Sequence, residues 1–123
     1  MIRALSFTAL IIFMFTCHAT HEVDTIPITK DIDMLIQANG VQIGGTLTTP
    51  DKKKSNSLVI MLSGSRPQDR DETLDGFKVF KVLAEHLGLQ GIATFRFDDR
   101  GVGASTGNFP ASTLEDHSKD VES

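Results

Sequence analysis

Ser105 is the side chain whose sequence context most directly suggests covalent chemistry. It lies in Gly103-Ala104-Ser105-Thr106-Gly107, which has the G-x-S-x-G spacing of a serine nucleophile that attacks acyl carbon atoms. Such a serine needs a sharp turn placed directly between a strand and a helix. Here residues 98–103 separate Ser105 from the preceding apolar run, and Asn108-Phe109-Pro110 is unsuited to starting a helix. We therefore interpret Ser105 as a structural residue that caps backbone groups.

Other chemistries are supported less well. The glycines of segment 101–107 resemble a dinucleotide fingerprint, but they do not open onto a helix, and the chain contains no G-K-[S/T] sequence. Asp69 and Asp71 begin an acidic loop that lacks the glycine of a calcium-binding EF-hand. His86 and His117 have no metal-ligand spacing. The sequence predicts neither a metal nor a cofactor.

The segment from Asp31 to Thr49 is expected to form a hairpin. Ile32 and its alternate apolar neighbours predict a strand with one polar face, and Asn39-Gly40 favours a tight type I′ turn. The second strand contains Gly44-Gly45, which predicts either a bulge or a close approach of neighbouring backbone.

A strand, helix and strand should follow the hairpin. Residues 58–62 form a continuous apolar run, which predicts a strand covered on both faces. Residues 77–87 carry an apolar stripe at helical spacing (Phe77, Phe80, Leu83, Ala84 and Leu87), with Gly88 and Gly91 as stop signals. Residues 92–97 form the second strand, parallel to the first. Thr113 and Asp116 then open another helix with a near capping box.

The fold class is therefore α/β, a β-hairpin followed by a parallel βαβ unit. Such a sheet would have an open edge, where another strand is expected. Two loops lie where the chemistry of such a sheet belongs, after each parallel strand: residues 62–71 (Leu-Ser-Gly-Ser-Arg-Pro-Gln-Asp-Arg-Asp) and residues 98–105 (Asp-Asp-Arg-Gly-Val-Gly-Ala-Ser).

These loops resemble those of the α/β-hydrolases. The later loop matches the D-x-R-G-x-G-x-S pattern after the fourth strand, through Asp98, Arg100, Gly101, Gly103 and Ser105. The earlier loop is similar to the G-S-G-P-x-D-R-D loop of a bacterial esterase and acyl-hydrolase subgroup. The resemblance extends from about the hairpin to the last residue, and it implies the N-terminal part of an α/β-hydrolase domain.

The resemblance also implies roles for individual residues. The backbone N–H of Ser65 matches the oxyanion-hole donor after the third strand, and Gly64 allows the tight turn beside it. By the order of the family, the catalytic serine, acid and histidine follow Ser123. Two departures stand out: Ser63 replaces a common histidine, and Arg66 replaces a glycine. Arg66 either favours an acidic substrate or folds outward and pairs with Asp69.

The expected function is hydrolysis of carboxylic esters or related acyl bonds in a small-molecule substrate. A peptidase of the same fold and a non-catalytic binding domain that retains the first half of the fold are the alternatives. The net charge of −4 and the absence of a long basic block argue against a nucleic-acid partner.

The N-terminus predicts export. Residues 1–19 read as a signal peptide, with Arg3 before a short apolar segment and a cleavage site after Ala19. Residues 20–30 form a linker, and residues 31–123 an incomplete domain. The apolar segment is too short to span a membrane stably. The expected location is periplasmic or secreted, and a lipid anchor at Cys17 is the alternative.

Overall fold

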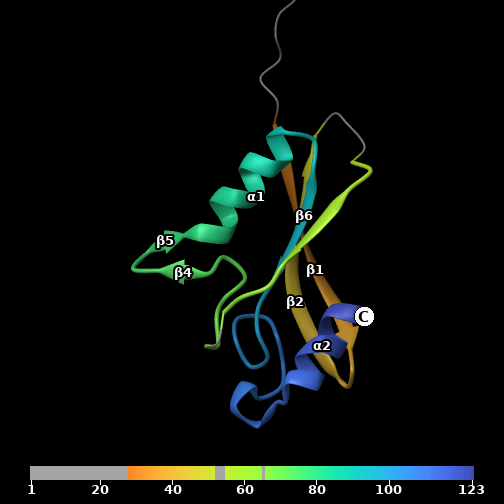
Figure 1. The fold of residues 1–123 in the computed structure, drawn as a ribbon, viewed down its shortest axis with the longest axis vertical. Helices are drawn as coiled ribbons and strands as arrows, with labels where there is room; N and C mark the ends of the chain where they lie inside the picture. Colours follow the sequence, from red (N-terminus) through yellow and green to blue (C-terminus); the bar gives the residue numbers. More distant parts are fainter. Residues whose placement is uncertain (1–27, 52–54, 65) are drawn as a thin grey trace, which may run out of the picture.

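The central sheet combines a hairpin with two parallel strands. The computed structural model describes residues 28–51, 55–64 and 66–123. The strands lie in the order β1 (Thr29–Ala38), β2 (Val41–Pro50), β6 (Ala93–Phe97) and β3 (Leu58–Met61) (Figure 1). Neighbours are antiparallel except β3 and β6, which are parallel and are connected through helix α1 (Val79–Leu89). The predicted hairpin and parallel βαβ unit are confirmed, within a mixed α/β fold.

The β1–β2 hairpin has the expected turn. Asn39 and Gly40 have positive φ angles of 39° and 79°, as a type I′ turn requires. Pairing continues without interruption along the whole hairpin, so the two glycines of β2 form no bulge. A Cβ atom at Gly44 would lie 2.5 Å from that of Ala104, and one at Gly45 would overlap an aromatic ring of β6. Close approach is therefore the reason for both glycines.

The segment before α1 differs from the prediction. Thr73–Leu74 (β4) and Phe77–Lys78 (β5) pair as a small antiparallel hairpin. An Asp-Gly pair with positive φ angles makes its turn, which is a dipeptide that two-residue hairpins favour. Phe77 consequently belongs to β5 rather than to the apolar stripe of the helix.

The predicted stop at Gly88 is also wrong. Gly88 lies inside α1, and a Cβ atom there would lie 2.5 Å from Cγ2 of Thr29. The glycine thus lets the helix pack closely onto β1. The helix ends at Leu89, followed by Gly91 with a φ angle of 86°.

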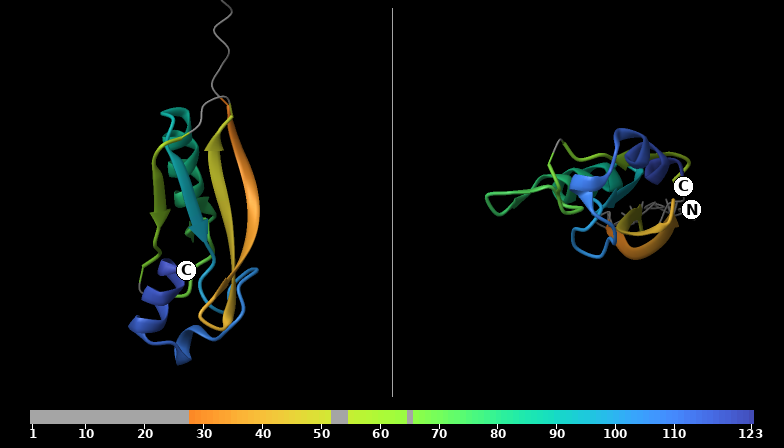
Figure 2. Two further views of the ribbon diagram at one scale, coloured as in Figure 1. Left: turned by 90° about the vertical axis from the view of Figure 1, so that its right-hand side faces the viewer. Right: turned by 90° about the horizontal axis from the view of Figure 1, so that it is seen from below.

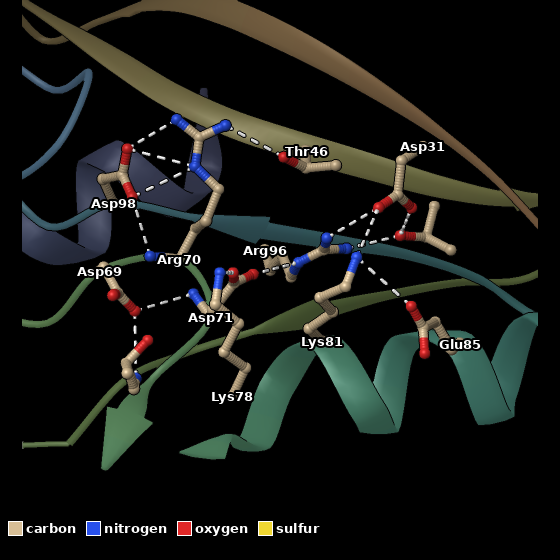
Figure 3. Close-up of polar contacts among 12 residues, drawn as sticks. Asp31, Thr46, Asp69, Arg70, Asp71, Lys78, Lys81, Glu85, Arg96 and Asp98 are labelled. Carbon is tan, nitrogen blue, oxygen red and sulfur yellow. Dashed lines mark hydrogen bonds and ion pairs between the residues drawn. The ribbon is translucent and has the colours of Figure 1, made fainter. Parts of the chain in front are cut away.

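The sheet face beneath α1 is polar and partly buried (Figure 3). Arg96 is only 3% exposed, and its guanidinium donates to Asp71 at 2.9 Å, to Asp31 at 3.0 Å and to Thr48. Lys81 of α1 adds an ion pair to Asp31 at 3.7 Å. The face of β1 that was predicted to contact only water therefore supplies counter-ions to a buried arginine.

The opposite sheet face is apolar and open. Figure 2 shows α1 covering one face, with β3 at one edge of the sheet. Ile32 and Met34 of β1 are each 39% exposed, and Leu58 and Ile60 of β3 are 56% and 40% exposed. The prediction that strand 58–62 is covered on both faces is therefore wrong for the described residues, because β3 lies at the sheet edge with one neighbouring strand, and α1 packs mainly on β6 and β2.

The last element is helix α2 (Leu114–Glu122), which follows a short 3₁₀ turn, η1 (Phe109–Ala111). The predicted capping box is confirmed: the Thr113 hydroxyl accepts from the Asp116 N–H, and the Asp116 carboxylate accepts from the Thr113 N–H. Across residues 28–51, 55–64 and 66–123, no helix is long and apolar enough to cross a membrane.

Several predictions fall on other parts of the chain. The signal peptide 1–19, Cys17 and most of the linker 20–30 lie outside the described residues, as does Ser65. β1 begins at Thr29, two residues before the start of the predicted hairpin at Asp31.

Candidate functional site

Two loops meet where the parallel strands end. Residues 62–72 (loop 62–72) follow β3, and residues 98–108 (loop 98–108) follow β6. In open α/β sheets, ligands bind outside the carboxyl ends of the strands, which is where both loops lie. The predicted motif residues Asp98, Arg100, Gly101, Gly103 and Ser105 are all within the second loop.

Asp98 is the central acceptor between the loops. Its side chain is 3% exposed and accepts hydrogen bonds from Arg70 Nη2 at 2.6 Å and from the Arg70 backbone N–H at 2.8 Å. It also accepts from the Ala104 N–H at 2.9 Å, within its own loop. Arg70 extends further to the Thr46 hydroxyl of β2 at 3.0 Å (Figure 3). One carboxylate thus fixes both loops to each other and to the sheet.

The electrostatics of this pair favour the charged forms. Burial raises the pKa of Asp98, but the hydrogen bonds from the Arg70 side chain and from the Ala104 and Arg70 N–H groups outweigh it, and the pKa lies below its ordinary value. The hydrogen bond to Asp98 raises the pKa of Arg70, against the opposing effect of burial. Both groups are therefore ionised at neutral pH.

Asp99 makes a second connection between the loops. It is 7% exposed, and its carboxylate accepts from the Ser63 hydroxyl at 2.8 and 3.0 Å and from the Gln68 N–H at 2.8 Å. Its own N–H donates to the Gln68 carbonyl at 3.1 Å. Asp99 was not among the predicted site residues, because it occupies the variable position of the D-x-R-G pattern.

The Ser105 hydroxyl is buried and hydrogen-bonds to backbone groups. The residue is 7% exposed, and its hydroxyl donates to the Asp98 carbonyl at 2.7 Å and accepts from the Gly44 N–H at 2.9 Å. Backbone groups therefore use its donor and one acceptor position. This geometry agrees with the expected capping role.

Arg100 connects loop 98–108 to α2. Its guanidinium makes two hydrogen bonds to the Asp120 carboxylate, at 2.6 and 2.7 Å, and the two side chains are 10% and 3% exposed. The hydrogen bond to Asp120 raises the pKa of Arg100. Gly103 adopts a φ angle of 52°, and a Cβ atom there would lie 2.5 Å from the Asp98 carboxylate. Gly101 also has a positive φ angle, of 74°.

A cavity of about 640 Å³ lies between the two loops and α2. Its polar lining comes from the two loops (Ser63, Gly64, Asp99 and Arg100) and from α2 (His117, Ser118, Asp120 and Glu122). Its remaining surface is largely apolar and includes Ile43, Leu62, Phe97, Phe109, Leu114 and Val121. The structure therefore brings Gly64 and Arg100 of the predicted site together, and it adds Asp99 and Ser63 to them.

The earlier loop differs from one expectation. Arg66 is exposed, and no ion pair joins it to Asp69 among the described residues. The Asp69 carboxylate instead accepts from the N–H groups of Asp71 and Thr73, both at 3.1 Å. Asp69 therefore stabilises the turn that leads into β4 rather than holding the arginine.

No group of three or more potential metal ligands (His, Cys, Asp or Glu) gathers within the ranges that the structure describes. His117 lies against the Phe109 ring, with ring centres 4.8 Å apart. The Asp71 carboxylate forms ion pairs with Arg96 and with Lys78, at 2.9 Å each.

Comparison with known proteins gives one partial likeness. No protein-family model matches the chain. A stretch of 65 residues is 35% identical to Esterase EstD from Thermotoga maritima, and this stretch is 53% of the present chain. The chain spans about 15% of the length of that curated relative, so the likeness concerns only a small part of it.

Proposed function

We propose that this chain belongs to an enzyme of the α/β-hydrolase fold that hydrolyses carboxylic esters or related acyl bonds, and that it contributes the oxyanion side of the active site. This proposal rests on one observation: loops 62–72 and 98–108 lie around a cavity at the carboxyl ends of β3 and β6. The partial likeness to an esterase supports an ester substrate over a peptide.

The chemistry requires donors that are fixed in place. Attack on an acyl carbon puts negative charge on its oxygen, and each preorganised backbone N–H aimed at that oxygen lowers the barrier by about 3–4 kcal/mol. In this fold, one donor comes from the loop after the third strand and the other from the residue after the nucleophile. We assign the first to the Ser65 N–H. Its neighbours Ser63 and Gly64 line the cavity.

The catalytic serine, histidine and acid are proposed to follow Ser123 in the complete gene product. The open sheet supports this part of the proposal, because Leu58 and Ile60 of β3 are exposed at an edge with one neighbour. A further parallel strand beside β3 would cover that edge and bring its own carboxyl end to loop 62–72. We also propose export through residues 1–19, so that the ester substrate is met outside the cytoplasm.

Activity-based labelling tests the proposal. The complete gene product should hydrolyse p-nitrophenyl butyrate and react stoichiometrically with a fluorophosphonate probe, and mass spectrometry should place the label outside residues 28–123. The probe should abolish hydrolysis. Absence of both hydrolysis and labelling, or a label on Ser105, would contradict the proposal.

Replacing Ser105 with alanine should lower stability without removing the reaction. The Gly44 N–H would lose its buried acceptor, which costs about 1–3 kcal/mol of unfolding free energy in a urea titration. Labelling and kcat per folded molecule should be retained. Ser112→Ala is the matched control: its hydroxyl makes one local hydrogen bond at the surface, and the expected change is within about 0.5 kcal/mol. A folded Ser105→Ala variant that no longer reacts with the probe would show that Ser105 is the nucleophile.

A further inference from the structure

The environment of Asp99 differs from that of the other buried carboxylates in this part of the molecule. Asp98 is paired with Arg70, and Asp120 with Arg100. In the described part of the chain, Asp99 makes no ion pair, although only 7% of it is exposed. A buried charge without a counter-ion is costly unless hydrogen bonds compensate it. All the compensating side-chain bonds of Asp99 come from loop 62–72.

These bonds attach two separate points of that loop. Ser63 lies at its beginning and donates its hydroxyl to both oxygens of the Asp99 carboxylate. Gln68 lies further along and is held through both backbone groups, by its N–H to the carboxylate and by its carbonyl to the Asp99 N–H. The backbone between the two anchors includes Gly64, which faces the cavity. Asp99, just after the end of β6, therefore holds the loop at two points, Ser63 and Gln68.

We propose that Asp99 is a positioning residue, which holds Ser63 and Gln68, and with them the cavity wall at Gly64, in the place that the reaction requires. This inference rests on the proposed acyl-hydrolase function. The carboxylate acts through geometry rather than through its charge, because a negative group in the cavity wall would by itself oppose a developing oxyanion. Fixed orientation is what gives oxyanion donors their effect.

Two substitutions of Asp99 distinguish a role in positioning the loop from a role that depends on its negative charge. Asp99→Ala removes every side-chain bond to Ser63 and Gln68. Asp99→Asn keeps one oxygen for the Gln68 N–H, and its amide group can donate to the Ser63 hydroxyl, which is also an acceptor. If Asp99 were instead a general base, the asparagine variant would be as inactive as the alanine variant. A positioning role therefore predicts rescue by asparagine.

The experiment uses the complete gene product with p-nitrophenyl butyrate. Asp99→Ala should lower kcat about 100-fold while KM changes less than about 3-fold, because misplacing one donor affects mainly the transition state. Asp99→Asn should remain within about 10-fold of the wild type, and Asp51→Ala, at an exposed position after β2, should be unchanged. Hydrogen exchange of the peptide covering residues 62–70 should be faster in Asp99→Ala only.

A double-mutant cycle provides the second measurement. Ser63→Ala should lower kcat about 10-fold, and the Ser63→Ala/Asp99→Ala variant should lose less than the product of the two single effects, since both changes remove the same bonds. This cycle keeps the proposal testable through Ser63→Ala and Asp99→Asn even where Asp99→Ala does not fold. Equal losses in Asp99→Asn and Asp99→Ala, or unchanged kcat in folded Asp99→Ala and Ser63→Ala, would overturn the positioning role.

The failure of this inference is distinguishable from the failure of the proposed function. A wild-type protein without esterase activity contradicts the function, whereas the exchange experiment still decides whether Asp99 restrains the loop. In that case, unchanged exchange of the peptide in Asp99→Ala would overturn the positioning role as well.

Discussion

Replacing Asp98 with alanine should lower the free energy of unfolding by about 3–5 kcal/mol, the range measured when one partner of a buried ion pair is removed. The variant would leave the Arg70 guanidinium, 19% exposed, without its nearest carboxylate. It would also leave the N–H groups of Arg70 and Ala104 without acceptors. Urea denaturation of the complete gene product, followed by circular dichroism, measures the change.

Asp33→Ala is the matched control because Asp33 pairs with the same arginine. That pair joins Arg70 Nη1 to Asp33 at 3.3 Å, but the Asp33 side chain is 84% exposed. Exposed ion pairs contribute about 0–1 kcal/mol, and Asp33 also accepts a hydrogen bond from the Thr46 hydroxyl at 2.6 Å, so the control should lose about 1–2 kcal/mol. Equal losses in the two variants would show that neither the burial of Asp98 nor its contacts between the loops add to the free energy of unfolding. The difference in unfolding free energy between the two variants therefore measures how much the contacts of Asp98 between the two loops stabilise the fold.

Local patterns in the sequence account for the elements that were predicted correctly. Asn39-Gly40 sets the turn of the first hairpin, and the capping box at Thr113 starts α2. Alternating and continuous apolar segments separate the hairpin strands from the parallel pair. Each of these signals depends on residues close together in the chain, so that no knowledge of tertiary packing is required.

The errors arise where distant segments decide the outcome. Asp31 and Asp33 have the alternation of a solvated strand face, yet β1 presents them to Arg96 and Arg70, which come from remote parts of the chain. The continuous apolar strand β3 lies at an edge, which periodicity alone does not distinguish from the centre of a sheet. One missed element had a local signal: the Asp-Gly turn between β4 and β5.

In the candidate site too, local sequence patterns predict some features, and contacts between distant segments determine the others. The positions of the two loops, and the structural role of Ser105, follow from motif spacing and the order of elements. The role of Asp99 depends on contacts with residues 31 and 36 positions away, Gln68 and Ser63. A second acidic residue directly after a strand is the feature of the sequence that could have pointed to Asp99. The partners of that residue became identifiable only when the two loops were placed side by side.

Acid should destabilise this fold through carboxylates that are paired in the folded state. Burial raises the pKa of Asp71, but hydrogen bonds from Lys78 and Arg96 outweigh it, so its pKa, like that of Asp98, lies below the ordinary value of 3.8. A depressed folded-state pKa contributes stability that is fully present above the ordinary value and is lost as the pH falls through the folded-state value. The unfolding free energy should therefore be flat between pH 7 and pH 5 with respect to these groups.

Below about pH 4, each such carboxylate should contribute a slope of up to about 1.4 kcal/mol per pH unit, because the unfolded chain binds a proton that the folded chain does not. Urea titrations of the complete gene product at pH 7, 5, 4 and 3 measure this slope. Asp71→Asn should be less stable at pH 7 and should show a shallower fall, whereas Asp51→Asn, at an exposed position, should follow the wild type. Identical slopes in Asp71→Asn and the wild type would mean that the ion pairs beneath α1 do not set the acid sensitivity. A shallower slope in Asp71→Asn would show that part of the acid sensitivity comes from the contact between β6 and loop 62–72, since the ion pair of Arg96 and Asp71 joins these two segments.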